Sequence, residues 1–132
     1  MKVIISPDSF KGTMSSVEAA ATIEKAIKQI SETIETVCLP VADGGEGTLD
    51  ALVAATNGRF VETTVCNPIG REIRARYGVL GDEKTCVIEM AEASGITLLS
   101  KEERNPMKAT TFGTGQLIDH ALCQGYRHFI IG

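Results

Sequence analysis

The first 56 residues alternate twice between a short apolar segment and a helical one, and this order is the strongest constraint on the fold. Val3–Ile5 form a β-branched run, which is typical of a strand buried on both faces. Apolar residues then recur at helical spacing over residues 16–30, behind the capping-box sequence SSVE. Residues 34–39 predict a second strand, and residues 48–56 predict a second helix. A strand–helix–strand–helix order implies a parallel sheet with right-handed crossovers.

The pattern changes after Gly58 to short alternating segments separated by turns. Residues 60–66, 72–79 and 85–90 predict strands, and the turns NPIG and GDEK between them favour antiparallel pairing. A short helix broken at Gly95, a glycine-containing turn, a helix and a last strand in YRHFIIG are expected to follow. We therefore expect an α/β fold: a Rossmann-like parallel sheet over residues 1–64, followed over residues 65–132 by part of a second, mixed α/β domain rich in antiparallel strands.

Composition narrows the class of protein. The chain has 132 residues, 43% hydrophobic and 23% charged, which suits a folded domain with its own core. The net charge of −4 comes from 17 acidic and 13 basic residues, and the basic residues are scattered, so no nucleic-acid partner is expected. The four cysteines lack a CxxC pair, and we expect reduced, mostly buried thiols.

Two absences bear on localisation and completeness. No segment approaches the ~20 apolar residues of a membrane span, and MKVIISPDSF lacks the apolar core of a signal peptide, so we expect a cytoplasmic protein without a membrane partner. The last predicted strand ends at Gly132 with no connection after it, so we expect a piece of something longer. Exposed strand edges would then favour either a homodimer or a complementary C-terminal portion.

The loops SPDSFKG and ADGGEG follow the two predicted parallel strands, at the edge of the sheet where ligands bind in such folds. Their side chains suit phosphoryl transfer, which needs positive charge on the moving oxygens, Mg²⁺ on the phosphates and a carboxylate near the attacking hydroxyl. Glycines would let the backbone approach a ligand closely. The candidate residues in these loops are Asp8, Ser9, Lys11, Asp43, Gly44, Gly45 and Glu46.

A third candidate segment is TTFGTG, in which Thr111, Gly113, Thr114 and Gly115 would cradle an anion at the start of the following helix.

Each of these candidate residues also has a purely structural interpretation. The DGG sequence can serve only as a turn and N-cap, Asp8 as a turn residue, and Thr114 as an ordinary N-cap. Glu89 and Glu92 would add carboxylates to the site, although solvated or interface-facing glutamates are favoured.

Other chemistries have weaker support. The sequence contains no GxxxxGK[ST], which excludes the usual P-loop, and GTGQLI lacks the third glycine of a dinucleotide fingerprint. His120 and His128 have no acidic or cysteine partner at ligand spacing, so structural roles are favoured for both. Lys11, Asp8 and Asp43 remain the candidate catalytic residues, with Asp43 and Glu46 as candidate Mg²⁺ ligands.

Five segments, in this order and spacing, resemble the N-terminal portion of the glycerate kinase family related to the bacterial glycerate 2-kinases: VIISPDSFKGTMSSVEAA, LPVADGGEGTLDALV, NPIGREIRARYGVL, VIEMAEASGITLL and NPMKATTFGTGQLI. The resemblance implies an ATP- and Mg²⁺-dependent kinase that phosphorylates D-glycerate at the 2-hydroxyl. It also implies two α/β domains with the active site between them, the second inserted into the first. Family chains continue past the strand matching YRHFIIG, so the resemblance places part of the cleft outside these residues and leaves catalysis by this chain alone open.

Two other functions remain open from the residues themselves. A non-catalytic α/β module would bind an anion or pack against a partner and use the glycine loops only as turns. A phosphosugar-type isomerase would need no ATP. In the kinase interpretation, Lys11 neutralises a phosphate or the glycerate carboxylate, and Asp43 and Glu46 engage Mg²⁺ or orient the hydroxyl. The segment 111–115 would offer backbone donors to the substrate.

Overall fold

A computed structural model describes residues 1–10 and 13–132 of the chain. Its strands are β1 (Lys2–Ile5), β2 (Glu35–Cys38), β3 (Arg59–Cys66), β4 (Glu72–Val79), β5 (Thr85–Ile88) and β6 (His128–Ile131). Its α-helices are α1 (Ser16–Ile30), α2 (Thr48–Thr56), α3 (Ala91–Ser94) and α4 (Phe112–Cys123), with 3₁₀ turns at Ile96–Leu98 and Lys101–Glu103. The predicted helices 16–30 and 48–56 are confirmed residue for residue.

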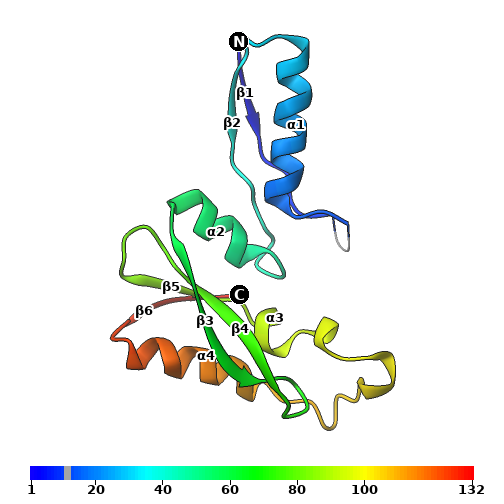
Figure 1. Ribbon diagram of the computed structural model, residues 1–132, viewed down its shortest axis with the longest axis vertical. Helices are drawn as coiled ribbons and strands as arrows, with labels where there is room; N and C mark the ends of the chain where they lie inside the picture. The colour runs from blue at the N-terminus through cyan, green and yellow to red at the C-terminus, as the bar shows by residue number, and fades with distance from the viewer. Residues whose placement is uncertain (11–12) are drawn as a thin grey trace.

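The N-terminal unit is a βαβ arrangement. Strands β1 and β2 pair in parallel, from Lys2 beside Glu35 to Ile5 beside Cys38, and α1 runs along them (Figure 1). The predicted capping box starts α1: the Ser15 hydroxyl accepts from the backbone N–H of Glu18 at 3.2 Å, and the Glu18 carboxylate accepts from the N–H of Ser15 at 2.9 Å. The predicted parallel pairing is therefore confirmed.

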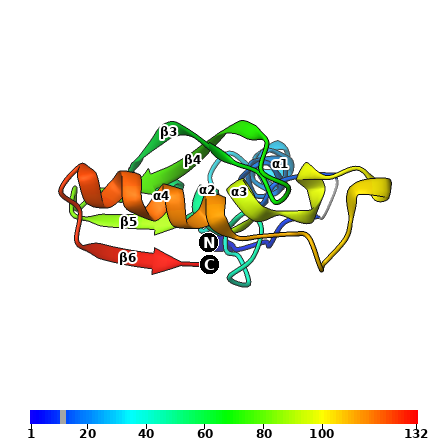
Figure 2. The ribbon, with the colours of Figure 1, turned by 90° about the horizontal axis from the view of Figure 1, so that it is seen from below.

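The rest of the chain forms a mixed sheet with the strand order β3-β4-β5-β6. The first two pairings are antiparallel, and β5 pairs with β6 in parallel (Figure 2). A connection through α3 and α4 makes the parallel pairing possible, because a parallel neighbour needs a long crossover. The mixed α/β class rich in antiparallel strands is confirmed.

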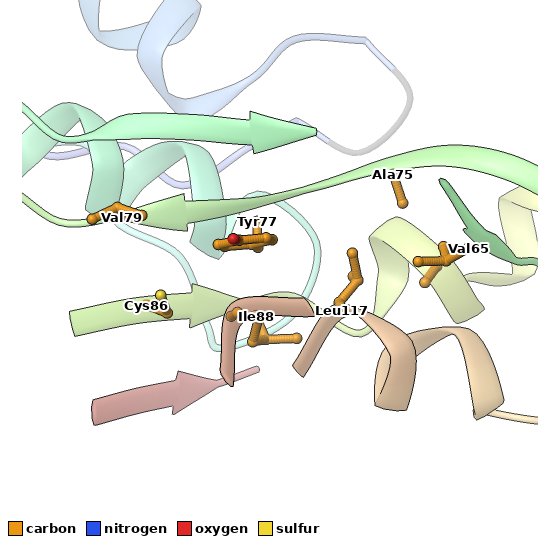
Figure 3. Close-up of a cluster of buried hydrophobic side chains, with 9 residues drawn as sticks. Val65, Ala75, Tyr77, Val79, Cys86, Ile88 and Leu117 are labelled. Carbon is orange, nitrogen blue, oxygen red and sulfur yellow. The ribbon is translucent and has the colours of Figure 1, made fainter. Parts of the chain in front are cut away.

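Alternating side chains of this sheet face different helices. Tyr77 and Val79 of β4 and Cys86 and Ile88 of β5 are fully buried with Leu117 of α4 (Figure 3). On the other face of the sheet, a second cluster joins Leu49 and Val53 of α2 to Leu80 and Val87. Since neighbouring residues of a strand point to opposite faces, the sheet is covered by α2 on one face and by α3 and α4 on the other.

Helix α2 thus packs on the second sheet, while it also contacts α1 of the first unit. The predicted division between residues 64 and 65 falls inside β3, which pairs continuously with β4 from Arg59 to Cys66. The two-domain division itself stays a prediction.

Two sequence-based expectations are wrong in detail. The cysteines are free thiols, but only Cys86 is buried, and Cys123 is exposed at the end of α4. Helix α4 begins at Phe112, so Gly113 and Thr114 lie inside its first turn and not in a turn before it. Within the part of the chain that the structure describes, no helix combines the length and apolarity needed to cross a bilayer.

Candidate active site

The ADGGEG loop leaves β2 and ends at the start of α2, next to the carboxyl end of β5. The Asp43 carboxylate accepts a hydrogen bond from the backbone N–H of Gly45 at 3.0 Å, which closes an Asx turn. Gly44 and Gly47 both have φ of 95°, a left-handed conformation that favours glycine. The side chains of Asp43 and Glu46 are exposed. The loop is therefore locally ordered, with its two carboxylates facing solvent.

Helix α2 has a glycine, Gly47, at its N-cap and no side-chain cap of its own. The carboxylate of Glu89, the residue after β5, takes this place. It accepts from the backbone N–H of Leu49 at 2.9 Å and from that of Gly47 at 3.1 Å, although Glu89 is only 4% exposed. Burial raises the pKa of Glu89; the two backbone hydrogen bonds oppose this shift, and the nearby charges of Glu92 and Asp50 add to it.

An arginine from the sheet joins α2 to α3 beside this carboxylate. Arg76 of β4 forms a bidentate ion pair with Asp50 of α2, at 2.9 and 3.1 Å, and a second ion pair with Glu92 of α3 at 2.8 Å. Its guanidinium also lies 4.6 Å from the ring centroid of Phe60. These contacts fix the first turn of α2 against the same sheet that carries Glu89.

Two adjoining cavities share Glu46 and Asp50. The first, of about 260 Å³, is also lined by Ser9 and Glu18, so its charged side chains among the described residues are all acidic. The second, of about 280 Å³, is lined also by Arg74, Arg76, Glu89 and Glu92. An anionic ligand in either cavity would need a cation to offset these carboxylates.

The SPDSFKG loop contributes Ser9 to the first cavity. Asp8 is exposed, and its carboxylate accepts from the backbone N–H of the adjacent residue, Ser9, at 2.6 Å. An Asx turn would instead use the N–H two residues on, so this contact does not give Asp8 the turn role. Lys11, the candidate cation, lies outside the described residues. The structure therefore brings Ser9 and Glu46 to one cavity, as the order of the parallel strands predicts.

The segment 111–115 lies at the start of α4. Thr111 is its N-cap residue, and Thr114 is 8% exposed and shares a 2.7 Å hydrogen bond with the Ser94 hydroxyl. A Cβ on Gly113 would lie 1.9 Å from the carbonyl oxygen of Cys66, so this glycine allows α4 to pack closely on β3. None of these residues lines the two cavities beside Glu46. The alternative of Thr114 as an N-cap is wrong.

The sequence did not single out Asp50 and Arg76, and it favoured a solvated or interface position for Glu89 and Glu92. For Glu89 this expectation is wrong, because its carboxylate is buried against the start of α2. Only the position of Glu89 at the end of the apolar segment 85–90, next to Met90, gave a signal, and its partners are 40 and 42 residues away. Such pairing is not visible in local sequence spacing.

The donor set can be tested against Mg²⁺, the ion that the resemblance implies. Within residues 1–10 and 13–132, no cluster of three or more metal-ligating side chains occurs. Mg²⁺ in nucleotide-dependent enzymes is held by one or two carboxylates together with substrate phosphates and water. The exposed carboxylates of Asp43 and Glu46 fit this mode, in which the protein supplies part of the coordination.

Comparisons with known proteins agree with these features. The family model described as glycerate kinase family matches residues 3–132, so the chain belongs to the glycerate kinase family. Among curated relatives, the glycerate kinase of Bacillus subtilis (strain 168) is 52% identical over 132 residues, and the glycerate 2-kinase of Escherichia coli (strain K12) is 46% identical over 132 residues. Both matches cover 100% of this chain and 35% of the relative.

A solved structure is similar to this chain in fold as well as in sequence. A crystal structure from Salmonella typhimurium LT2, described as a glycerate kinase 2, matches with a TM-score of 0.86 and 46% sequence identity. The match covers 100% of this chain and 36% of that one. The chain therefore spans about a third of the length of the relatives that it matches.

Proposed function

We propose that the protein containing this chain transfers the γ-phosphoryl group of ATP to D-glycerate, at the 2-hydroxyl, with Mg²⁺ and in the cytoplasm. Membership of the glycerate kinase family supports the reaction class. The observation that carries the proposal is the placement of Asp43 and Glu46, whose exposed carboxylates stand on one ordered loop beside an acidic cavity.

In this proposal the loop carboxylates act through the metal ion. Mg²⁺, when bound, neutralises the phosphates and offsets the acidic lining of the cavities. Asp43 and Glu46 hold the ion or orient the substrate hydroxyl, and Ser9 offers a polar group to the substrate from the neighbouring loop. Lys11 supplies positive charge to a phosphate or to the glycerate carboxylate. Asp8, next to Ser9, is a further candidate catalytic carboxylate.

The remaining candidates take a more peripheral role. Gly44 and Gly45 give the loop its turn. Thr111, Gly113 and Thr114 at the start of α4 offer backbone donors to the substrate once the rest of the protein is in place, whereas the N–H of Gly115 donates to the Thr111 carbonyl within the helix. The remaining two thirds of a family chain, or a second copy, would complete the cleft. We expect the 132 residues alone to be inactive.

The alternative of a simple anion-binding module has less support. An anion cradle needs free backbone N–H groups. In the ADGGEG loop, the N–H of Gly45 donates to Asp43 and that of Gly47 donates to Glu89, and the N–H of Leu49 in α2 also donates to Glu89. The loop presents carboxylates to solvent and is better suited to a cation or a hydroxyl than to a phosphate.

Asp43→Asn in the full-length protein tests the proposal. Asparagine keeps the acceptor for the Gly45 N–H and removes the charge, so the turn is retained and the metal interaction is weakened. Turnover with D-glycerate, ATP and Mg²⁺ should fall by about a hundredfold or more, the scale of losing one electrostatic contact at a reaction centre. ADP release measured with a coupled assay gives the value.

Asp82→Asn is the matched control, because Asp82 is also an exposed turn aspartate and accepts from the N–H groups of Lys84 and Thr85 at 3.0 and 2.9 Å. It lies in the turn between β4 and β5, so its replacement should leave turnover unchanged. Equal turnover of the Asp43 variant and wild type would reject the role of Asp43.

A further inference from the structure

We propose that Glu89 is a positioning residue, which fixes the ADGGEG loop against the four-stranded sheet and so sets the place of Asp43 and Glu46. The inference rests on the proposed function for its effect on turnover. The contact between Glu89 and the start of α2 rests on the observed hydrogen bonds alone. Glu89 follows β5, lies 40 residues from its partner Leu49, and holds the start of α2 from outside the helix.

The start of α2 needs such an outside partner. The first N–H groups of a helix have no acceptor within the helix, and a side chain at the N-cap usually supplies one. Gly47 occupies the N-cap with φ of 95° and has no side chain to offer. The Glu89 carboxylate replaces that cap, and its two oxygens lie 3.1 and 3.2 Å from the Gly47 nitrogen.

Two features of the start of α2 stabilise the charge of the Glu89 carboxylate and oppose the effect of its burial. Hydrogen bonds from N–H groups to an ionised acceptor are stronger than neutral ones, and the helix dipole favours negative charge at this end. The Asp50–Arg76–Glu92 ion pairs hold the same first turn of α2 to β4 and α3. The start of the helix is therefore fixed at two points on one sheet, and the loop that carries Asp43 and Glu46 ends at the first of them.

The hydrogen bonds from these N–H groups to Glu89 also limit which ligands the loop can bind. With Gly47 and Leu49 bound to Glu89, the start of α2 is not open to a phosphate. Glu89 itself is 4% exposed, so it does not present a charge to a ligand in solution. Its contribution is the rigidity of the loop, since a carboxylate that must meet a metal or a hydroxyl loses efficiency when it is displaced by about 1 Å.

Glu89→Gln tests the inference with little change in volume. The amide retains one acceptor oxygen but turns an NH₂ group toward the backbone N–H groups. Asn67→Ala is the control: Asn67 is also 4% exposed and accepts from the N–H groups of Ile69 and Arg71 at 3.1 and 2.9 Å, in the turn between β3 and β4. Glu89→Gln weakens, and Asn67→Ala removes, a buried acceptor of two backbone N–H groups.

Two readouts separate positioning from folding. Hydrogen exchange by mass spectrometry in the full-length protein should be faster across residues 44–50 in Glu89→Gln, and unchanged there in Asn67→Ala. Turnover should fall about tenfold or more in Glu89→Gln, as is common for residues that orient a ligand. The Mg²⁺ concentration for half-maximal activity should rise. Asn67→Ala should lower the melting temperature and keep turnover and Mg²⁺ dependence within about twofold of wild type.

Unchanged exchange across residues 44–50 would show that Glu89 does not hold the loop. Faster exchange with wild-type turnover and Mg²⁺ dependence would show that holding the loop does not matter for the reaction. Either result overturns the inference. A wild-type protein without glycerate-dependent ADP release would reject the proposed function, while the exchange data would still decide whether Glu89 anchors the loop.

Discussion

Burial of the Glu89 carboxylate has a free-energy penalty, and the groups around it offset part of that penalty. Removing a carboxylate from water is unfavourable, and the free-energy penalty is reduced only when the charged form is well hydrogen-bonded. Here two backbone N–H groups donate to it, while Asp50 of α2, Glu92 of α3 and Glu46 of the loop add negative charge nearby and Arg76 of β4 adds positive charge. The net result is a raised pKa.

This shift predicts a pH dependence of stability. Between the ordinary value of 4.5 and the raised value, the folded protein binds more protons at Glu89 than the unfolded chain does. The free energy of unfolding must therefore fall as pH rises through this window. Glu89→Gln removes the titrating group, so its stability should fall less steeply than that of wild type over the same pH range.

Urea denaturation at several pH values, with both proteins in the same buffers, measures the difference in slope. Parallel slopes for wild type and Glu89→Gln would contradict the raised pKa. Asp82→Asn provides a check of the opposite sign. Hydrogen bonds from Thr85 and Lys84 lower the pKa of Asp82 to about 2, so its contribution to stability is present at neutral pH and is lost on acidification.

At the scale of the element, the sequence was sufficient wherever the determining contacts are local. The bounds of α1 follow from its capping box and apolar spacing, and those of α2 follow from the glycines before it and the left-handed C-cap at Asn57. The face against which α2 packs could not be predicted. Its partners, Leu80 just after β4 and Val87 of β5, are far along the chain, and periodicity shows only that a helix has an apolar side.

In the candidate site, too, the sequence predicted the local features and missed the contacts between distant residues. The carboxylates of the ADGGEG loop were found because they follow a predicted strand, and strand order placed Ser9 near them. Glu89, Asp50 and Arg76 were missed as partners because only the folded sheet brings them together. In the first turn of α4 the anion cradle stays a prediction, and the sequence could not show the close packing at Gly113 or the Thr114–Ser94 hydrogen bond, because their partners are distant in the chain.

Two glycines of α4 provide a paired test of this packing. Gly113→Ala would place a Cβ 1.9 Å from the Cys66 carbonyl oxygen, whereas Gly115→Ala would have no heavy atom within 4 Å of the added Cβ. The first change should destabilise the fold by about 1–3 kcal/mol or more, as overpacking does. The second should stabilise it by up to about 1 kcal/mol through helix propensity. Thermal or urea unfolding of both variants measures this contrast, and equal effects would contradict the close packing of α4 on β3.

At the scale of the whole molecule, the chain consists of a βαβ unit and a four-stranded sheet with helices on both faces (Figures 1 and 2). The ADGGEG loop connects them and is attached to the second sheet through Glu89. Acidic side chains dominate the cavities on either side of Glu46, which matches the net charge of −4. Glycerate and ATP are themselves anions, so a divalent cation is central to the proposed reaction.

The most direct test of the account is a coupled ADP-release assay with D-glycerate and ATP, with and without Mg²⁺, on the full-length protein and on this chain. The account predicts ADP release by the full-length protein that requires both glycerate and Mg²⁺, and none by the 132 residues alone. ADP release by the full-length protein that does not depend on glycerate, or no release at all, would contradict it.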